Sequence, residues 1–363
     1  MPSSRPKRRI AIVTGTRAEF GLLRTVIDHC LHNRKLTTQL YVTGTHLTLG
    51  TDKDICAARY PITARIPMQK KTELGRSADA QALGRGVTGF TKAFAKHKPD
   101  VIMVLGDRIE AFAAASAASI AGIRVAHIHG GDRAEGVADE AIRHAITKLA
   151  HLHFPATATS RRRLIRLGEH SSTIHQVGSP AIDGLDQIVS DPHAPRAIVL
   201  HHPIGDDPAT EARRMHHILK ATAHLKPLVL SPNADPGADG ILRAIQQTKP
   251  NHLTHLKRED FLSLLAGTEL LIGNSSTGLI EAAALGTPAI NIGPRQAGRE
   301  RPASVIDCAD SQTAIRRAIR YAINQPPKRR KHPYGNGTAG QQIACLLASF
   351  SEQSVPLRKQ NSY

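Results

Sequence analysis

Short apolar runs alternate along the chain with longer stretches of helical periodicity, from near the start to about residue 323. The runs are continuously apolar, which is typical of parallel strands covered on both faces. In the first half, strands are predicted at residues 10–13, 39–42, 101–105, 124–128, 152–154 and 173–177. The helices predicted between them span residues 20–33, 77–96, 110–121 and 139–150.

A polar stretch with two prolines, residues 190–195, interrupts this pattern and is typical of an interdomain linker. The alternation then begins again. Strands are predicted at residues 197–200, 228–230, 252–255, 270–272 and 289–292. The matching helices span residues 210–224, 239–249, 258–266 and 277–285.

Repeated strand–helix–strand units predict an α/β fold with parallel sheets. We expect two Rossmann-like, doubly wound domains with a cleft between them. Residues 1–189 would form the first domain and residues 190–345 the second, with a basic tail at residues 346–363. One last helix is predicted within residues 337–349.

The amino-acid composition disfavours several classes of protein. The 363 residues include 48 Lys and Arg against 30 Asp and Glu, a net charge of +18, and 40% are hydrophobic, which is typical of a globular protein. Aromatic residues make up only 3%, without Trp, which disfavours folds that stack RNA bases on aromatic side chains. No apolar run approaches the roughly 20 residues of a membrane span, and the four cysteines are scattered. We therefore expect a soluble cytoplasmic protein that binds neither membrane nor nucleic acid.

Acidic and histidine residues gather at the ends of the predicted strands in the first half. Asp107 and Arg108 follow strand 101–105, and strand 124–128 leads into a segment containing His129, Asp132 and Glu135. The next helix begins with Asp139 and Glu140 and continues with Arg143 and His144. Helix N-termini favour acids in any case, but that does not explain Asp107 and Asp132. Arg17, in the loop after the first strand, is placed to bind a phosphate.

The second half places small and polar residues at the same kind of position. The segment Gly273-Asn-Ser-Ser-Thr-Gly278 joins a strand to a helix, so its backbone N–H groups could bind phosphate. Ser275 or Ser276 could equally be the helix N-cap, and the two roles are compatible. Other predicted strand ends supply His202, Asn233 and Arg295. Together these loops predict a nucleotide diphosphate held between two lobes.

Two further patterns are weaker. Gly84-Arg-Gly-Val-Thr-Gly89 matches G-x-G-x-x-G, but it interrupts a helical pattern and follows no strand, so it lacks the geometry of a dinucleotide site. His127 and His129 share one face of a strand, yet no Cys or HExxH partner follows and the chain contains 20 histidines. No metal site is predicted.

Over nearly its whole length the chain resembles the UDP-N-acetylglucosamine 2-epimerase family, most closely its hydrolysing branch in sialic-acid-type biosynthesis. The resemblance rests on motifs in matching order: Gly15-Thr-Arg-Ala-Glu-Phe-Gly, Gly106-Asp-Arg, His127-Ile-His-Gly-Gly, Asp139-Glu-Ala-Ile-Arg-His, Ser231-Pro-Asn, Gly273-Asn-Ser-Ser-Thr-Gly and Gly286-Thr-Pro-Ala-Ile-Asn-Ile-Gly. It implies the glycosyltransferase-B fold, no metal or cofactor, and a homo-oligomer (dimer or tetramer).

The resemblance also implies a reaction. The C2 proton of UDP-GlcNAc is removed while UDP leaves from C1, and water adds to the resulting glycal to release N-acetylmannosamine. Matching positions make Asp107, Asp139 and Glu140 catalytic, and they make His202 either catalytic or a contact of the diphosphate. Positions that match nucleotide-binding residues are Arg17, Arg108, Asn233, Ser275, Ser276, Glu281 and Arg295. We expect Glu135 and His144 to contact the substrate as well.

One position departs from some members, which have a catalytic Glu where this chain has His129. Asp132, Glu135 or His129 itself could take that role, since a neutral imidazole can act as a base near pH 7. The loop from residue 132 to 139 is also one residue longer than in those members. Both differences are compatible with a related substrate, such as UDP-N,N'-diacetylbacillosamine, in place of UDP-GlcNAc.

The sequence is compatible with two other classes of protein. A glycosyltransferase would share the fold, but it would need an acceptor pocket and would not need so many acids. A non-enzymatic polyanion binder would use the +18 charge. Release of UDP without any acceptor distinguishes the epimerase from both.

Overall fold

The computed structural model describes residues 6–73, 75–134, 140–233, 235–324 and 332–362. Two six-stranded sheets account for the strands, and each pairing is parallel. The first sheet has the order β3-β2-β1-β4-β5-β6 and the second β12-β11-β10-β7-β8-β9. Numbered within its own unit, each sheet has the strand order 3-2-1-4-5-6 of a dinucleotide-binding fold. The predicted α/β fold of two doubly wound parallel sheets is confirmed.

The strands of the first sheet are β1 (Arg8–Thr14), β2 (Leu36–Thr43), β3 (Ile62–Ile66), β4 (Val101–Leu105), β5 (Arg124–Ile128) and β6 (Leu152–Phe154). Its helices are α1 (Arg17–His32), α2 (Thr45–Leu49), α3 (Asp52–Ala57), α4 (Arg76–His97), α5 (Ile109–Ile120), α6 (Glu140–Leu149), α7 (Ala158–Arg166) and α13 (Ala339–Ser349).

The second sheet contains β7 (Ala197–Leu200), β8 (Leu228–Leu230), β9 (His252–Leu253), β10 (Leu270–Gly273), β11 (Ala289–Ile292) and β12 (Val305–Cys308). Its helices are α8 (Pro208–Thr222), α9 (Ala238–Thr248), α10 (Arg258–Gly267), α11 (Glu281–Leu285) and α12 (Gln312–Ile323).

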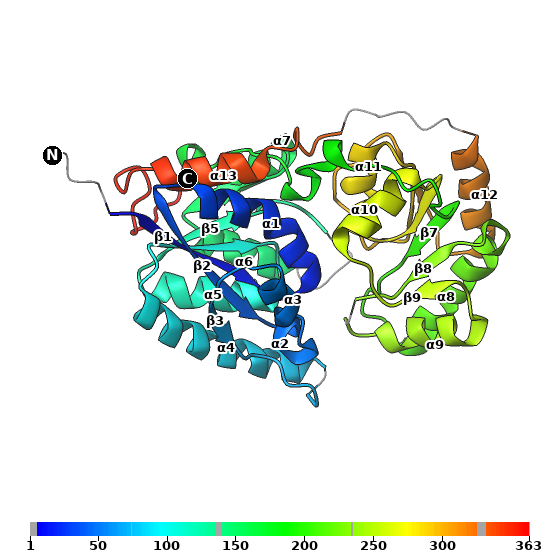
Figure 1. Ribbon diagram of the computed structural model, residues 1–363, viewed down its shortest axis with the longest axis horizontal. Helices are drawn as coiled ribbons and strands as arrows, with labels where there is room; N and C mark the ends of the chain where they lie inside the picture. The colour runs from blue at the N-terminus through cyan, green and yellow to red at the C-terminus, as the bar shows by residue number, and fades with distance from the viewer. Residues whose placement is uncertain (1–5, 74, 135–139, 234, 325–331, 363) are drawn as a thin grey trace. The chain divides into compact units, whose positions relative to one another are not determined.

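The chain crosses between two compact units more than once. The first unit contains Met1–Asp132, Asp139–Asp183 and Gly335–Tyr363, and the second contains Gly184–Tyr334 with Arg133–Ala138. This division differs from the predicted domains. The first unit ends at residue 183 and not at residue 189, and residues 335–363, which were predicted as the end of the second domain and a tail, belong to the first unit. The physical reason is α13, which packs against α1 through an apolar face that includes Ile343 and Leu347 (Figure 1).

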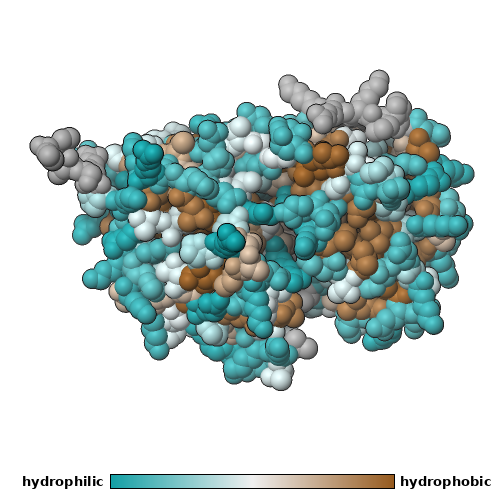
Figure 2. All heavy atoms as spheres, viewed as in Figure 1, coloured by the Kyte–Doolittle hydropathy of each residue, from teal (hydrophilic) through white to brown (hydrophobic). Residues whose placement is uncertain are grey.

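Side chains of β1 alternate between two cores of the first unit. Ile10 and Ile12 pack on the side of α1 and α13, whereas Ala11 and Val13 pack on the side of α4, α5 and α6 (Figure 1). Helices on both faces of a parallel sheet explain why its strands are apolar throughout. On the face shown in Figure 2, hydrophilic side chains predominate, with smaller hydrophobic patches among them.

Several sequence-based expectations need correction. The strands β3 and β12 were not predicted; both are short and only partly buried, so their apolar pattern is weak. Residues 173–177 were predicted as a strand, but they follow a 3₁₀ turn and contribute only a single bridge, between Ile174 and His153. The predicted helix 277–285 is a 3₁₀ turn (Ser276–Gly278) followed by α11.

The glycines at 84, 86 and 89 lie inside α4, as the sequence indicated, so they form no phosphate-binding turn. Gly86 and Gly89 instead allow close packing, because a Cβ atom at either position would lie 2.6 Å from Met68 or Ile66. Within the described residues, no helix combines the length and apolar character needed to cross a membrane.

Candidate active site

Arg143 lies at the centre of a charged network in the first unit. Its side chain is only 2% exposed, and its guanidinium contacts the carboxylates of Asp107 and Glu140, the latter at 2.8 Å from Nη1. The same Nη1 donates to the backbone carbonyl of Asp132 at 3.1 Å. A guanidinium presents several donors in a fixed plane, so it can hold two acids at defined positions.

The two acids of this network remain accessible. The side chains of Asp107 and Glu140 are 20% and 22% exposed. Asp107 follows β4 at its carboxyl end, where ligands bind in sheets of this type. His144, one turn along α6, contacts the second oxygen of Glu140 at 3.2 Å. The predicted residues Glu135 and Asp139 lie outside the described residues.

His129 and Asp132 form a second network beside the first. The Nδ1 atom of His129 lies 2.8 Å from the Asp132 carboxylate, and its Nε2 lies 3.0 Å from the Ser179 hydroxyl. The other carboxylate oxygen of Asp132 accepts from Ser160 at 2.7 Å. An ionised carboxylate only accepts, so Nδ1 carries the proton, and in the neutral ring Nε2 accepts from Ser179.

The backbone around His129 is unusual. His129 has a φ of 63°, a left-handed conformation that is uncommon for a residue with a side chain and tends to occur at functional sites. Gly131 has a φ of 77°, and a Cβ there would lie 2.4 Å from the Ser160 carbonyl oxygen. The turn after β5 thus brings Asp132 against α7 only with glycine at position 131.

The two arginines of the first unit that are predicted to bind substrate have partners within the protein. Arg17 forms an exposed ion pair with Asp54, with Nη2 at 2.5 Å from the carboxylate. Arg108 contacts the fully buried Glu110 at 3.3 Å. Glu19 lies close by and accepts from the Gly15 N–H at 2.5 Å. Burial raises the pKa of Glu19 to about 8.

Asn274 organises the corresponding edge of the second unit. Its side-chain amide pairs with the backbone of His202 on both sides: Oδ1 accepts from the N–H at 2.7 Å, and Nδ2 donates to the carbonyl at 2.8 Å. Gly273, just before it, ends β10 with a φ of 148°, and a Cβ there would lie 1.9 Å from the Leu200 carbonyl oxygen. Only glycine permits this close approach of the two strand ends.

The ring of His202 is held in one neutral form. Its Nδ1 accepts from the Asn233 N–H at 3.1 Å, so in the neutral ring the proton lies on Nε2. Burial and the nearby Arg295 guanidinium hold the pKa of His202 well below its usual value. His202 is therefore suited to donate a hydrogen bond to an anion.

Arg295 connects the remaining parts of this edge. It donates to the carbonyl of Asn274 at 3.4 Å and lies 4.0 Å from the Asp235 carboxylate, which also accepts from the Asn233 side chain. Gln296 donates to the same Asn274 carbonyl at 2.9 Å. The second unit thus presents a cation, amides and a neutral imidazole rather than paired acids.

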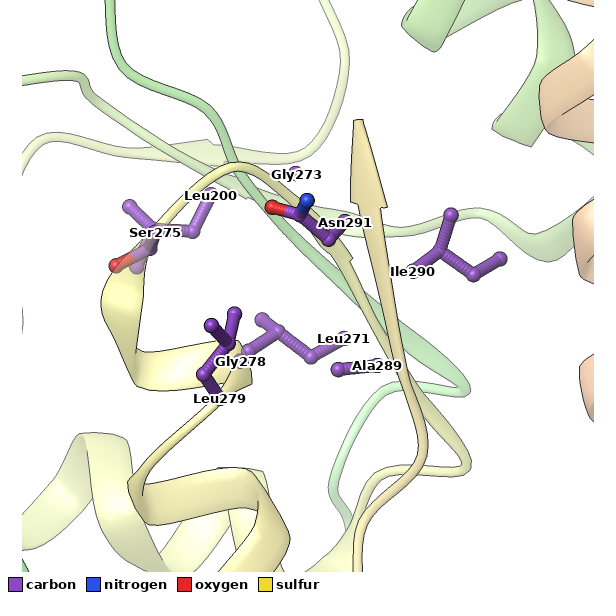
Figure 3. Close-up of a pocket in the computed structure, with 9 residues that line it drawn as sticks. All are labelled: Leu200, Leu271, Gly273, Ser275, Gly278, Leu279, Ala289, Ile290 and Asn291. Atoms are coloured by element: carbon purple, nitrogen blue, oxygen red, sulfur yellow. The ribbon is translucent and has the colours of Figure 1, made fainter. Parts of the chain in front are cut away.

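Ser275 is the N-cap that the sequence allowed, accepting from the Thr277 N–H at 3.3 Å. It also lines a small pocket between β10, β11 and the following turn, together with Leu200, Gly273 and Asn291 (Figure 3). Its volume of about 10 Å³ leaves room for about one water molecule, so the pocket is too small to hold a nucleotide by itself.

Two other predicted ligands of the second unit are placed as follows. Ser276 begins the 3₁₀ turn after Ser275. The carboxylate of Glu281 is buried and lies 3.3 Å from Nη1 of Arg258.

Three further histidines of the first unit contact groups outside the two acid networks. His127 is fully buried and bonds to the Gly106 carbonyl at 2.7 Å, and His153 contacts Glu169 at 3.0 Å. His151 bonds to the carbonyl of Leu357 at 3.2 Å. Across the described part of the chain, no three His, Cys, Asp or Glu residues are arranged to hold a metal ion.

Several residues that organise these networks were assigned no role from the sequence. Arg143, Ser160 and Ser179 in the first unit, and Asn274 in the second, make the contacts that orient the predicted residues. Arg143 and Asn274 lie inside motifs that were recognised, so their polar character was a usable signal. Ser160 and Ser179 lie in segments without a motif, and only the fold brings them to His129 and Asp132.

Comparison with known proteins identifies the family. Residues 29–348 match the model of the UDP-N-acetylglucosamine 2-epimerase family. A hydrolysing UDP-N,N'-diacetylbacillosamine 2-epimerase of Legionella pneumophila is 36% identical, covering 98% of this chain and 100% of the relative. A UDP-N-acetylglucosamine 2-epimerase of Neisseria meningitidis is 33% identical over 87% of this chain and 88% of its own length.

The fold agrees with that result. A crystal structure of UDP-GlcNAc 2-epimerase from Neisseria meningitidis bound to UDP-GlcNAc superposes with a TM-score of 0.80 at 19% identity, covering 93% of this chain and 99% of that one. Motif order, family match and full-length relatives lead to one conclusion: the chain belongs to the UDP-N-acetylglucosamine 2-epimerase family.

Proposed function

We propose that this protein is a hydrolysing UDP-sugar 2-epimerase that converts a UDP-linked 2-acetamido sugar and water into UDP and the free 2-epimer. The Legionella relative, which matches over the full length of both chains, favours UDP-N,N'-diacetylbacillosamine as substrate. The Neisseria relative makes UDP-GlcNAc the second candidate.

The observation that supports this proposal most is the pair of accessible acids, Asp107 and Glu140, on one buried guanidinium. Elimination of UDP needs a base at C2, and addition of water to the glycal needs an acid. Asp107, His129, Asp132, Asp139 and Glu140 are the proposed acid–base residues. A transferase would have no use for a base at C2.

The second unit would bind the nucleotide. Arg295 and the Nε2–H of His202 supply a positive charge and a neutral donor, which stabilise a departing diphosphate. Ser275, Ser276 and Asn233 would add hydrogen bonds, and Glu281 would accept from the ribose hydroxyls. Arg17, Arg108, Glu135 and His144 complete the proposed substrate contacts.

The test is incubation with each UDP-sugar in deuterated water, without any acceptor. We expect UDP together with a free sugar of inverted C2 configuration that contains deuterium at C2. Asp107→Asn serves as the control, with turnover expected to fall by about two orders of magnitude. UDP release without inversion at C2, or no release until an acceptor sugar is added, would contradict the proposal.

A further inference from the structure

The C-terminal segment after α13 is anchored although residues 351–362 form neither helix nor strand. Val355 is 3% exposed and joins the core around α1, and its carbonyl accepts from the Arg124 guanidinium at 2.8 Å. Two residues further on, the carbonyl of Leu357 accepts from His151 at 3.2 Å. These contacts hold the segment against the first unit.

Lys359, within this segment, caps the C-terminal end of α6. Its ammonium donates to the carbonyls of Thr147 and Lys148 at 3.0 and 2.9 Å. Its third partner is the buried Glu169 carboxylate at 2.5 Å. All three donors of the ammonium are thereby used, and a cation at a helix C-terminus compensates the partial negative charge of its last carbonyls.

The same cluster reaches the end of α7. The Lys148 ammonium contacts Glu169 at 2.8 Å, the Leu167 carbonyl at 2.9 Å and the Asn361 side chain at 2.8 Å. The N–H of Ser362 donates to the Gly168 carbonyl at 3.0 Å. The C-terminal segment therefore joins the last turn of α6 to the turn that follows α7.

Both helices contact the acid networks from their other parts. The first turn of α6 supplies Glu140 and Arg143, and α7 supplies Ser160 to Asp132 and Arg163 to the Gly131 carbonyl at 3.2 Å. α6 has only ten residues, about 15 Å, and energetic coupling is carried by packed side chains and rigid secondary elements of this kind. A change at its last turn is therefore transmitted to Arg143.

We propose that Lys359 and Glu169 are positioning residues for the acid networks. They fix the positions of α6 and α7. In this way they hold Arg143 against Asp107 and Ser160 against Asp132. The inference rests on the proposed function for its catalytic readout, but its structural part is independent of any substrate.

The test compares Lys359→Met with Arg358→Met in the full chain. Met keeps most of the lysine stem and removes the charge, and Arg358 is an exposed neighbour that serves as the matched control. We expect Lys359→Met to lower kcat for the UDP-sugar at least tenfold with little change in KM, since a small misplacement of reacting groups reduces the chemical step. Lys359→Arg, which retains donors and charge, should recover most of the loss.

Hydrogen exchange of α6 without substrate provides the second readout. We expect Lys359→Met, and not Arg358→Met, to increase exchange at His144 and Ala145 as well as at the last turn. If kcat falls no further than in Arg358→Met, the positioning role is excluded even where the last turn exchanges faster. If wild type turns over no UDP-sugar, the proposed function fails, and exchange at His144 and Ala145 still decides whether the C-terminal segment controls α6.

Discussion

The two sheets share one strand order but provide different chemistry at their carboxyl ends. In the first unit the loop after β4 presents Asp107, which pairs with Arg143 of α6, and the loop after β5 presents Asp132 paired with His129. In the second unit the loops after β7 and β10 present His202 and Asn274, joined by amide hydrogen bonds.

The scaffold therefore determines where polar groups gather, whereas the side chains determine what they can do. Paired acids and an Asp–His pair suit proton transfer. A neutral imidazole, amides and a guanidinium suit binding of an anion whose charge grows as it leaves.

Replacing Arg143 should have the largest effect. Arg143→Met would leave Asp107 and Glu140 without their shared counter-ion, in a site where the guanidinium is almost fully buried. We expect activity below detection and a loss of about 3 kcal/mol in the free energy of unfolding. Denaturant titration and UDP release measure the two effects. Arg143→Lys keeps the charge but lacks the planar, two-pronged guanidinium, so it should recover part of the stability. If Arg143→Met were as stable as wild type, the central role of this residue would be refuted.

Asp107→Asn should reduce kcat by about two orders of magnitude, because the amide cannot take up a proton in the way a carboxylate does. Asp100→Asn is the matched control, since Asp100 lies at the opposite end of β4 and pairs with Arg9. Steady-state UDP release distinguishes them. Near-normal turnover of Asp107→Asn would remove this residue from the catalytic set.

Arg295→Ala should raise the KM for the UDP-sugar about tenfold or more, through the loss of one charged hydrogen bond to the diphosphate. The control is Arg301→Ala, which removes an ion pair with Asp307 on the same unit. Inhibition by UDP should weaken in parallel with the rise in KM. An unchanged KM and unchanged inhibition would contradict nucleotide binding by the second unit.

Two buried groups, one in each unit, should make the free energy of unfolding depend on pH in opposite directions. Burial lowers the pKa of His201 to about 3, so its neutral form stabilises the fold above pH 6.5 and this contribution is lost as the pH falls. Burial raises the pKa of Glu19 to about 8, so its contribution is present below pH 4.5 and is lost as the pH rises toward 8. Each slope is at most ~1.4 kcal/mol per pH unit.

Denaturant titrations between pH 5 and 8 check both slopes. His201→Gln should flatten the loss of stability below pH 6.5, and Glu19→Gln should flatten the loss toward pH 8. Slopes identical to wild type in both variants would show that neither group changes its protonation on folding.

Local pattern determined most of the elements. Apolar runs such as those of β4, β5 and β11 were predicted with their observed bounds, because a strand covered on both faces has a signal confined to its own residues. The repeated strand–helix–strand pattern also predicts polar loops at the carboxyl ends of the strands, but it leaves the strand order open, because more than one order is compatible with it. Asp107, His202 and Asn233 were recognised in this way.

Tertiary structure alone decided which of these residues act together. Arg143 meets Asp107 across 36 positions, and Ser179 meets His129 across 50, and neither separation leaves a periodic trace in the sequence. It also decided that the C-terminal residues return to the first unit, where Lys359 caps α6. Such contacts depend on shape and burial in three dimensions, whereas hydrophobic period records only which face of an element is covered.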